Sequence, residues 1–120
     1  MDTENAILCF AALAQPTRLG IFQALVQHAP EGLAAGDIAR RLVVPHNTLS
    51  AHLAVLSKAG LIIGERHSRS IVYRADLDRF RTLNLYLLND CCGGRPDVCA
   101  PLIAALTPCR PDPAKEPTDG

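Results

Sequence analysis

A change of periodicity at Gly60 constrains the fold of this chain more than any other feature of its sequence. Residues 46–59 carry leucines at spacings of four and three, which is the period of one face of an α-helix. Residues 61–66 and 70–75 are instead β-branched and partly alternating, and they flank a short polar turn, which predicts a two-stranded hairpin. Gly60, between the two patterns, is suited to end the helix as a C-cap glycine.

Helical spacing predicts three helices before this unit, over residues 4–14, 16–28 and 35–42, and a long final helix from Asp76 to about residue 90. The Ala- and Leu-rich composition supports helices, because both residues have high helix propensity. The expected fold is mainly α with a two-stranded β-hairpin, in the order four helices, hairpin, helix. This is the order of a winged helix-turn-helix, in which the second helix of a short pair enters the DNA major groove.

Glycine and proline divide the rest of the chain. A Gly-Gly pair follows the last helix, and the stretch after residue 106 contains four prolines and almost no apolar side chains. We therefore expect three parts: a DNA-binding and dimerisation domain over 1–92, a ligand-binding segment over 93–106 and a flexible tail over 107–120.

The formal net charge is zero, but the charges are unevenly distributed along the chain. Residues 1–39 sum to −3 and residues 75–120 to −2, whereas residues 40–74 carry six Arg and Lys side chains against Glu65 alone, for +5. The local field of a surface, and not the net charge, attracts a polyanion. The middle third of the chain therefore predicts double-stranded DNA as a partner.

The predicted recognition helix has two faces. Its leucines face the core, so the short polar side chains between them face outward. Asn bonds adenine, a Thr methyl contacts thymine, Ser bonds phosphate, and Arg at a wing tip reads the shape of the minor groove. The residues predicted to contact DNA are His46, Asn47, Thr48, Ser50, Ala51 and His52 on this helix, Arg66 and Arg69 on the wing, and Arg40 and Arg41 on the preceding helix.

Two runs of sequence resemble the ArsR/SmtB family of small winged-helix repressors. They are Gln15-Pro16-Thr17-Arg18-Leu19-Gly20-Ile21-Phe22 and Asn47-Thr48-Leu49-Ser50-Ala51-His52-Leu53-Ala54-Val55-Leu56-Ser57-Lys58-Ala59-Gly60-Leu61-Ile62, which contains the pattern S-x-H-L-x-x-L-x-x-A-G-L. The resemblance covers residues 6 to about 90. It implies a homodimer on a near-palindromic operator, which represses in the free state and is released when an ion binds.

The first and last helices carry more apolar residues than so small a core needs, which independently favours a dimer formed by these two helices. The residues predicted to form it are Ile7, Phe10, Leu13, Phe80, Leu83 and Leu87.

Cys91, Cys92 and Cys99 lie within nine residues of one another, close to the end of the last helix. Three thiols can converge on one soft ion, and trivalent arsenic or antimony prefers three thiolates in a pyramid. Many ArsR/SmtB members carry a cysteine pair before the recognition helix, where residues 32–38 of this chain have none. The three cysteines resemble the displaced site of some arsenic-responsive members, which implies As(III) or Sb(III) as inducer, with no catalytic cofactor.

Other uses of these thiols stay open. Zinc favours four ligands in a tetrahedron, so a zinc, cadmium or lead site would draw on Cys109, whereas methylarsenite would need only two thiolates. A disulfide between Cys99 and one of the adjacent pair would make a redox sensor, and the thiols could also be incidental small apolar residues. Cys9 is expected in the core, with a cross-subunit role left open.

An enzyme is not expected, because a thiol or arsenate reductase needs an anion-binding loop around its nucleophile, and Asn89-Asp90 before Cys91 is a poor oxyanion cradle. A protein-interaction module on the same fold would show DNA affinity that is absent or insensitive to salt. No apolar run reaches about 18 residues, and the acidic N-terminus lacks a basic n-region. We therefore expect no membrane contact and a cytoplasmic location, where thiols stay reduced.

Overall fold

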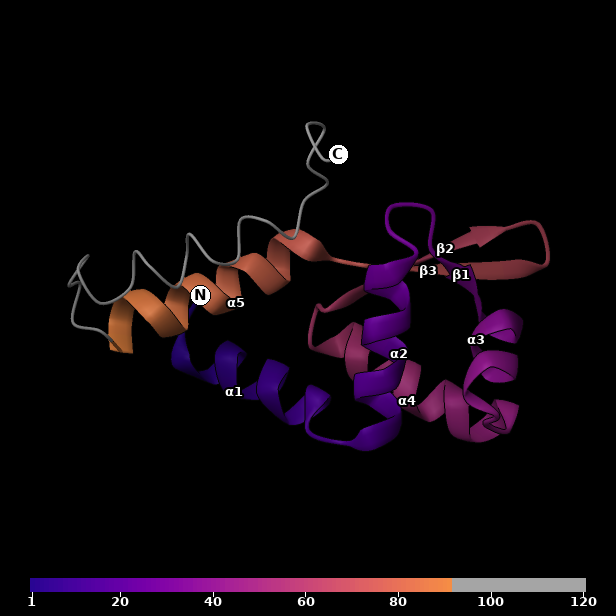
Figure 1. Cartoon of the computed structure of the whole chain (residues 1–120), viewed down its shortest axis with the longest axis horizontal. Helices are drawn as coiled ribbons and strands as arrows, with labels where there is room; N and C mark the ends of the chain where they lie inside the picture. Colours follow the sequence, from indigo (N-terminus) through magenta and orange to yellow (C-terminus); the bar gives the residue numbers. More distant parts are fainter. Residues whose placement is uncertain (92–120) are drawn as a thin grey trace, which may run out of the picture. The chain divides into compact units, whose positions relative to one another are not determined.

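The computed structural model describes residues 1–91 of the chain, with side chains up to Leu88. The helices are α1 (Thr3–Leu13), α2 (Pro16–Gln27), α3 (Ala35–Leu42), α4 (His46–Lys58) and α5 (Leu77–Cys91), and the strands are β1 (Leu33–Ala34), β2 (Ile62–His67) and β3 (Ser70–Ala75). This order, drawn in Figure 1, confirms the predicted winged helix-turn-helix. None of the helices that the structure describes is long and apolar enough to cross a lipid bilayer.

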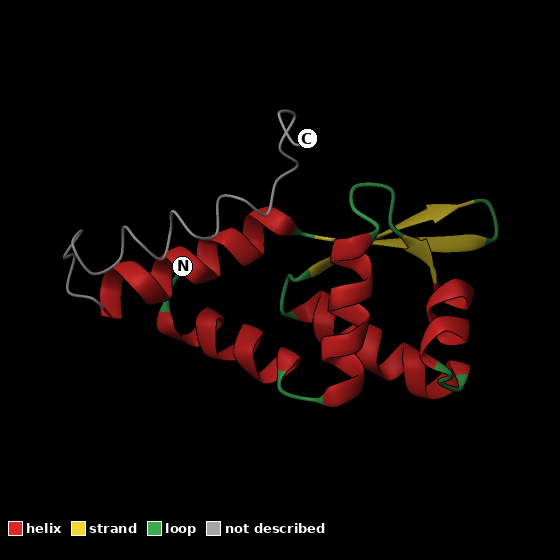
Figure 2. Ribbon diagram, viewed as in Figure 1, coloured by secondary structure: helices red, strands yellow, loops and turns green. Residues whose placement is uncertain are grey.

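The sheet has one strand more than the predicted hairpin. Strands β2 and β3 pair antiparallel, from Ile62 opposite Ala75 to His67 opposite Ser70, as the sequence indicated. The short strand β1 pairs antiparallel with the other edge of β3, which gives the order β1-β3-β2. Figure 2 shows β2 and β3 side by side, with the turn that joins them at the end away from α5. The winged unit is therefore anchored to the segment before α3 through β1.

Local side-chain contacts fix where the first helices begin. The Asp2 carboxylate accepts a hydrogen bond of 2.9 Å from the Asn5 backbone N–H, which caps α1. The Gln15 side chain accepts one of 2.8 Å from the Arg18 backbone N–H, and Pro16 occupies the first turn of α2, where its missing N–H costs nothing. The predicted start of α2 is therefore confirmed.

The core lies where α2, α3 and α4 pack against one another and the base of the sheet. Leu49, Leu53 and Leu56 of α4 are 1%, 3% and 0% exposed, so the leucine spacing identified the inward face of this helix. Full burial of one such side chain contributes about 1.5–3 kcal/mol. The rings of Phe22 and Phe80 pack at a centroid distance of 5.2 Å and an interplanar angle of 50°, which joins α2 to the first turns of α5.

The chain divides into two compact units, Met1–Leu83 and Asn84–Gly120. The first unit contains α1 to α4, the sheet and the first two turns of α5, and so holds the complete helix-turn-helix and wing. The second begins within α5, and its described part is helical as far as Cys91.

Candidate nucleic-acid interface

Helix α4 presents a face of mostly polar and small side chains to solvent, opposite its buried leucines. The predicted DNA contacts His46, Asn47, Thr48, Ser50 and Ala51 are all exposed. This exposed face continues along the helix beyond the predicted contacts, through Ala54, Val55, Ser57 and Lys58. The sequence analysis did not predict these four residues as DNA contacts, although they lie next to the buried Leu53 and Leu56 and so face outward by the same helical period. One face of α4 therefore packs into the core, and the opposite face is free to enter a DNA major groove.

The start of α4 has few local partners for its backbone N–H groups. Pro45 occupies the N-cap position and makes no side-chain hydrogen bond to the helix. The Asn47 Oδ1 atom accepts a hydrogen bond of 2.9 Å from the Thr48 backbone N–H.

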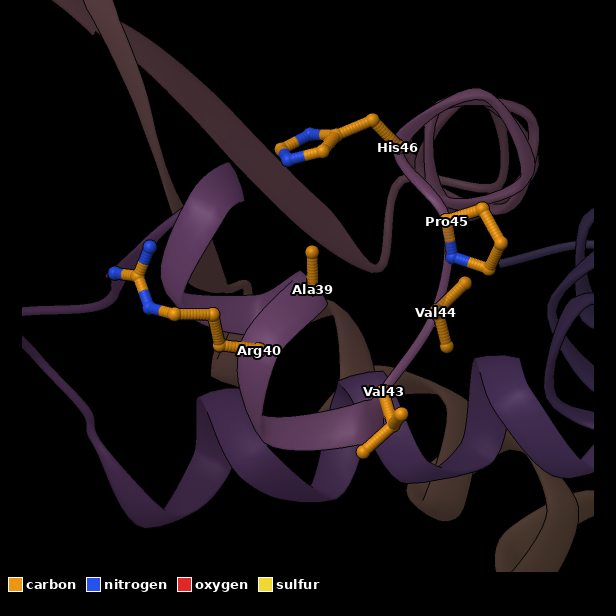
Figure 3. A pocket seen from close by; sticks show the side chains of 6 residues that line it. All are labelled: Ala39, Arg40, Val43, Val44, Pro45 and His46. Carbon is orange, nitrogen blue, oxygen red and sulfur yellow. The ribbon is translucent and has the colours of Figure 1, made fainter.

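The turn between α3 and α4 borders a shallow hollow of about 430 Å³, shown in Figure 3. It is open to solvent and lies between the end of one helix and the start of the next. Its lining residues are Ala39, Arg40, Val43, Val44, Pro45 and His46. Val43 ends α3 in the left-handed conformation (φ 53°, ψ 56°), and its side chain is 87% exposed.

The wing carries the second group of predicted contacts. Arg66 and Arg69 are exposed on either side of the turn, where Ser68 has a φ of 60°. Within the part of the chain that the structure describes, neither of these arginines forms an ion pair. Glu65 lies partway along β2, and its carboxylate is 3.4 Å from Arg74 Nη2 and 3.8 Å from His67 Nε2. The only carboxylate among residues 40–74 therefore contacts Arg74 and His67 and forms no ion pair with Arg66 or Arg69.

The two predicted contacts on α3 are partly engaged with other side chains. Arg40 Nη2 pairs with Asp37 Oδ1 one turn earlier on the same helix. Arg41 Nη2 lies 2.6 Å from Nε2 of His28, at the end of α2. Both arginines are exposed, so their contacts are surface contacts of small energy that DNA phosphates could displace.

His52 differs from the other predicted contacts on α4. It is half-buried, and its Nδ1 atom lies 3.4 Å from Nη1 of Arg18 on α2. Arg18 also donates from Nε to the Ala12 carbonyl at 2.6 Å and from Nη2 to the Ala11 carbonyl at 3.3 Å. Sequence reasoning gave Arg18 no role of its own, although it is the only Arg or Lys among residues 1–39.

The predicted dimerisation residues fall into three groups. Ile7 and Phe10 on α1 are 61% and 42% exposed, and Leu87 in the second unit is 39% exposed. Leu13 and Phe80 are half-buried, the latter against Phe22. Leu83 is 1% exposed, which assigns it to the core of the chain rather than to a surface that a second chain could cover.

The cysteines are distributed between the described and undescribed residues. Cys9 is fully buried, as expected, and its thiol donates a 3.4 Å hydrogen bond to the Ala59 carbonyl just after α4. Cys91 is the last residue of α5. The other predicted ligands, Cys92 and Cys99, lie outside the described residues, as does Cys109. Among the residues whose side chains are described, no three His, Cys, Asp or Glu are grouped so that they could hold a metal ion.

Comparisons with known proteins agree with this fold. A helix-turn-helix domain family matches residues 13–65. The HTH-type transcriptional repressor SmtB of Mycobacterium tuberculosis is 35% identical over 74 residues, which are 62% of this chain and 51% of that repressor. An ArsR-like transcriptional regulator from Rhodococcus sp. RHA1 is 26% identical with a TM-score of 0.65, over 87% of this chain and 93% of that one. A homodimeric winged helix-turn-helix DNA-binding domain from Mycobacterium bovis is 28% identical with a TM-score of 0.60, over 71% and 77%.

The chain spans between about half and two thirds of the length of the curated relatives that it matches, 61% of one and 51% of another. The relatives and solved structures named above are described as transcriptional regulators or as a DNA-binding domain of one. In sequence and in fold the chain is therefore similar to winged helix-turn-helix transcriptional regulators, among them a repressor named SmtB and an ArsR-like regulator.

Proposed function

We propose that this chain is a cytoplasmic transcriptional repressor that binds operator DNA as a homodimer and leaves it when trivalent arsenic or antimony binds to cysteine thiolates. The observation that carries the DNA-binding part is the exposed polar face of α4 beside a wing whose tip arginines have no ion-pair partner among the described residues. Short polar side chains on a helix and arginines on a hairpin are the groups that read a major groove and an adjacent minor groove.

Each part of the interface has a separate task in this proposal. Asn47, Thr48 and Ser50 contact base edges and nearby phosphates, because they lie on the first two turns of α4, the part of a recognition helix that meets the bases. Arg66 and Arg69 contact the backbone or the minor groove. Arg40 and Arg41 add positive charge to the adjacent helix, at the cost of their contacts with Asp37 and His28.

A homodimer would place two such units on two half-sites about one turn of DNA apart. The exposed apolar residues of α1, Ile7 and Phe10, support this part of the proposal, because a second chain would remove them from water. The homodimeric domain from Mycobacterium bovis shares this fold with a TM-score of 0.60.

The inducer part rests on the chemistry of the donor set. Cys91, Cys92 and Cys99 supply three soft thiolates, which suit a three-coordinate metalloid better than tetrahedral zinc. Cys91 ends the helix that carries the proposed dimer contacts. An ion that binds the free dimer more tightly than the DNA-bound dimer weakens operator affinity by the same factor, because the coupling is reciprocal.

The DNA-binding part is tested by selecting bound sequences from a pool of random duplexes and measuring the affinity of the selected duplex over a range of salt concentrations. Asn47→Ala should lose about 1–3 kcal/mol and relax the preference at one base pair. Arg69→Gln should weaken binding to all sequences alike and lower the salt slope by about 1. Affinity that is absent or independent of salt would point to a protein-interaction module instead.

The inducer part is tested by DNA release with arsenite, antimonite, methylarsenite, cadmium, zinc and peroxide. The intact chain is compared with Cys91→Ser, Cys92→Ser and Cys99→Ser, and Cys109→Ser serves as the matched control. We expect arsenite and antimonite to release the intact chain and the control, and none of the other three variants. Arsenite release that is unchanged in Cys99→Ser rejects the three-thiolate site. Release by cadmium or zinc alone favours a soft-metal sensor, and release by peroxide alone a redox sensor.

A further inference from the structure

One arginine joins three helices of the first unit. Arg18, on the first turn of α2, donates hydrogen bonds to the last carbonyls of α1 and lies within hydrogen-bond distance of a histidine on α4. Its side chain is half-buried, so these contacts are less exposed to solvent than those of the surface arginines. The distances are 2.6 Å to the Ala12 carbonyl, 3.3 Å to the Ala11 carbonyl and 3.4 Å to His52 Nδ1.

The end of α1 interacts favourably with a cation, and Arg18 of α2 supplies one. No basic residue lies in the last turn of α1, where the carbonyl groups without helical partners concentrate partial negative charge. The planar guanidinium of Arg18 presents donors in several directions at once and remains charged at every physiological pH. A lysine would offer one compact ammonium and could not reach both carbonyls and the histidine with the same geometry.

The contact with α4 also sets the state of His52. Arg18 has donors and no acceptor, so the ring nitrogen that faces it must be the acceptor. An Nδ1 atom that accepts from Arg18 carries no proton, so the donor of this ring is Nε2, the nitrogen on its other side. His52 lies one helical turn after Thr48 and is half-buried against α2, so Arg18 holds the recognition helix close to the residues that we assign to DNA.

We propose that Arg18 is a positioning residue that ties recognition helix α4 to the end of α1 and thereby sets the angle and spacing at which two α4 helices meet two half-sites. The inference rests on the proposed function, because α1 is the helix assigned to the dimer. A second link strengthens the same connection: the Cys9 thiol on α1 and the Arg79 Nε on α5 both donate to the Ala59 carbonyl after α4, at 3.4 and 3.3 Å. Helix α1 is therefore linked to α4 at two places: near the middle of α4 through Arg18 of α2, and after the end of α4 through Cys9.

The experiment measures binding to the selected operator, to the same operator with one base pair inserted or deleted between the half-sites, and to a non-specific duplex. The proteins are the intact chain, Arg18→Lys, Arg18→Gln, His52→Asn and His52→Leu. Arg69→Gln is the control that removes a charge expected at the phosphates. Circular dichroism and a urea midpoint confirm that each variant folds, and sedimentation confirms that it is dimeric.

We expect Arg18→Lys to weaken operator binding at least about tenfold more than non-specific binding, and to lose much of the discrimination between correct and altered spacing. His52→Asn keeps an acceptor near the position of Nδ1 and should retain that discrimination, whereas His52→Leu should lose it. The salt slope of Arg18→Gln should match that of the intact chain, because no phosphate contact is removed.

Three results would overturn the proposal. A salt slope lowered by about 1 in Arg18→Gln, as in the Arg69→Gln control, would make Arg18 a phosphate contact. Unchanged spacing discrimination in Arg18→Lys and His52→Leu would leave Arg18 with a structural role only. If the arginine variants unfold, His52→Leu decides the question alone, and its unchanged discrimination rejects the proposal. Failure of the proposed function is a separate outcome, because the intact chain would then select no sequence.

Discussion

Val43 has a backbone conformation that β-branched residues rarely adopt. Its φ of 53° and ψ of 56° lie in the left-handed region, which costs an L-residue about 1–2 kcal/mol and a β-branched one more. Its side chain is 87% exposed, so the free energy gained by burying it does not offset the strain of the backbone. The turn of the helix-turn-helix therefore keeps a residue that is unfavourable for folding at the border of the proposed DNA-binding face.

We expect Val43→Gly to stabilise the chain by about 0.5–1 kcal/mol, because glycine removes the strain and loses part of that gain through its freer unfolded state. The measurement is the midpoint of urea unfolding. Val44→Gly is the matched control, since Val44 lies next in the chain without a left-handed φ, and it should destabilise. A loss of stability in Val43→Gly would mean that the valine side chain contributes more than its exposure indicates.

Asp2 makes the stability of α1 depend on pH. Its pKa lies below the ordinary value of 3.8, first because the carboxylate accepts the Asn5 backbone N–H and second because it accepts the Asn5 side-chain amide. A lowered folded-state pKa contributes stability that is complete above the unfolded value and disappears as the pH falls through the folded value.

The difference in urea midpoint between the intact chain and Asp2→Asn should therefore be constant above about pH 5 and shrink as the pH falls below the ordinary carboxyl range. Asparagine is a good N-cap, so the comparison isolates the charge from the capping geometry. A midpoint difference that does not change between neutral and acidic pH would show that the Asp2 charge contributes nothing to folding.

At the scale of elements, helix α4 was predictable because its leucines repeat at helical spacing, and these leucines are buried. The start of α2 was predictable from a different signal, because Pro16 suits the first turn of a helix. Strand β1 was missed because two residues, Leu33 and Ala34, cannot show an alternation, and their pairing partners, Tyr73 and Val72, are far away in the sequence. The bridging contacts of Arg18 were missed for a related reason, since they depend on how three helices pack and not on any local spacing.

The candidate site was predictable to a similar extent. Five polar or small residues of α4 were correctly expected at the surface, because their positions follow from the helical period. The half-buried state of His52 depends on the neighbouring helix, which no pattern within α4 records. The approach of Cys92 and Cys99 to Cys91 stays a prediction, because Cys92 and Cys99 lie outside the residues that the structure describes.

The attachment of β1 to the wing gives an element-scale prediction. Gly32 has a φ of 83°, and a Cβ atom there would lie 2.3 Å from the Tyr73 carbonyl oxygen. Gly32→Ala should therefore destabilise the chain by about 1–3 kcal/mol. Gly36→Ala, inside α3, is the opposite control, because its Cβ would meet only Arg40 at 3.6 Å and alanine favours a helix by about 0.5–1 kcal/mol. Equal effects of the two substitutions on thermal unfolding would contradict this account of the β1 junction.

At the scale of the whole molecule, α1 exposes apolar side chains that a single chain leaves in contact with water. Phe10 is 42% exposed and lies on the helix that packs beside α4 through the Cys9 contact with Ala59. Val26 on α2 is 41% exposed and has no assigned partner surface in the proposal. These two positions differ little in exposure, so the same change at each separates dimerisation from a general effect of placing a charge on the surface.

Phe10→Asp should convert the dimer into a folded monomer, because a carboxylate in a dimer interface would lose its hydration without a partner. Each folded monomer would then hold one half-site only, and its affinity should fall towards the non-specific range of about 10⁻⁴–10⁻⁶ M. Val26→Asp should remain dimeric and bind as the intact chain does. Sedimentation gives the oligomeric state, circular dichroism gives the fold, and fluorescence anisotropy gives the affinity. A Phe10→Asp variant that stays dimeric with full operator affinity would place the dimer interface away from α1, and the link through Arg18 would then connect α4 to a free helix rather than to the partner subunit.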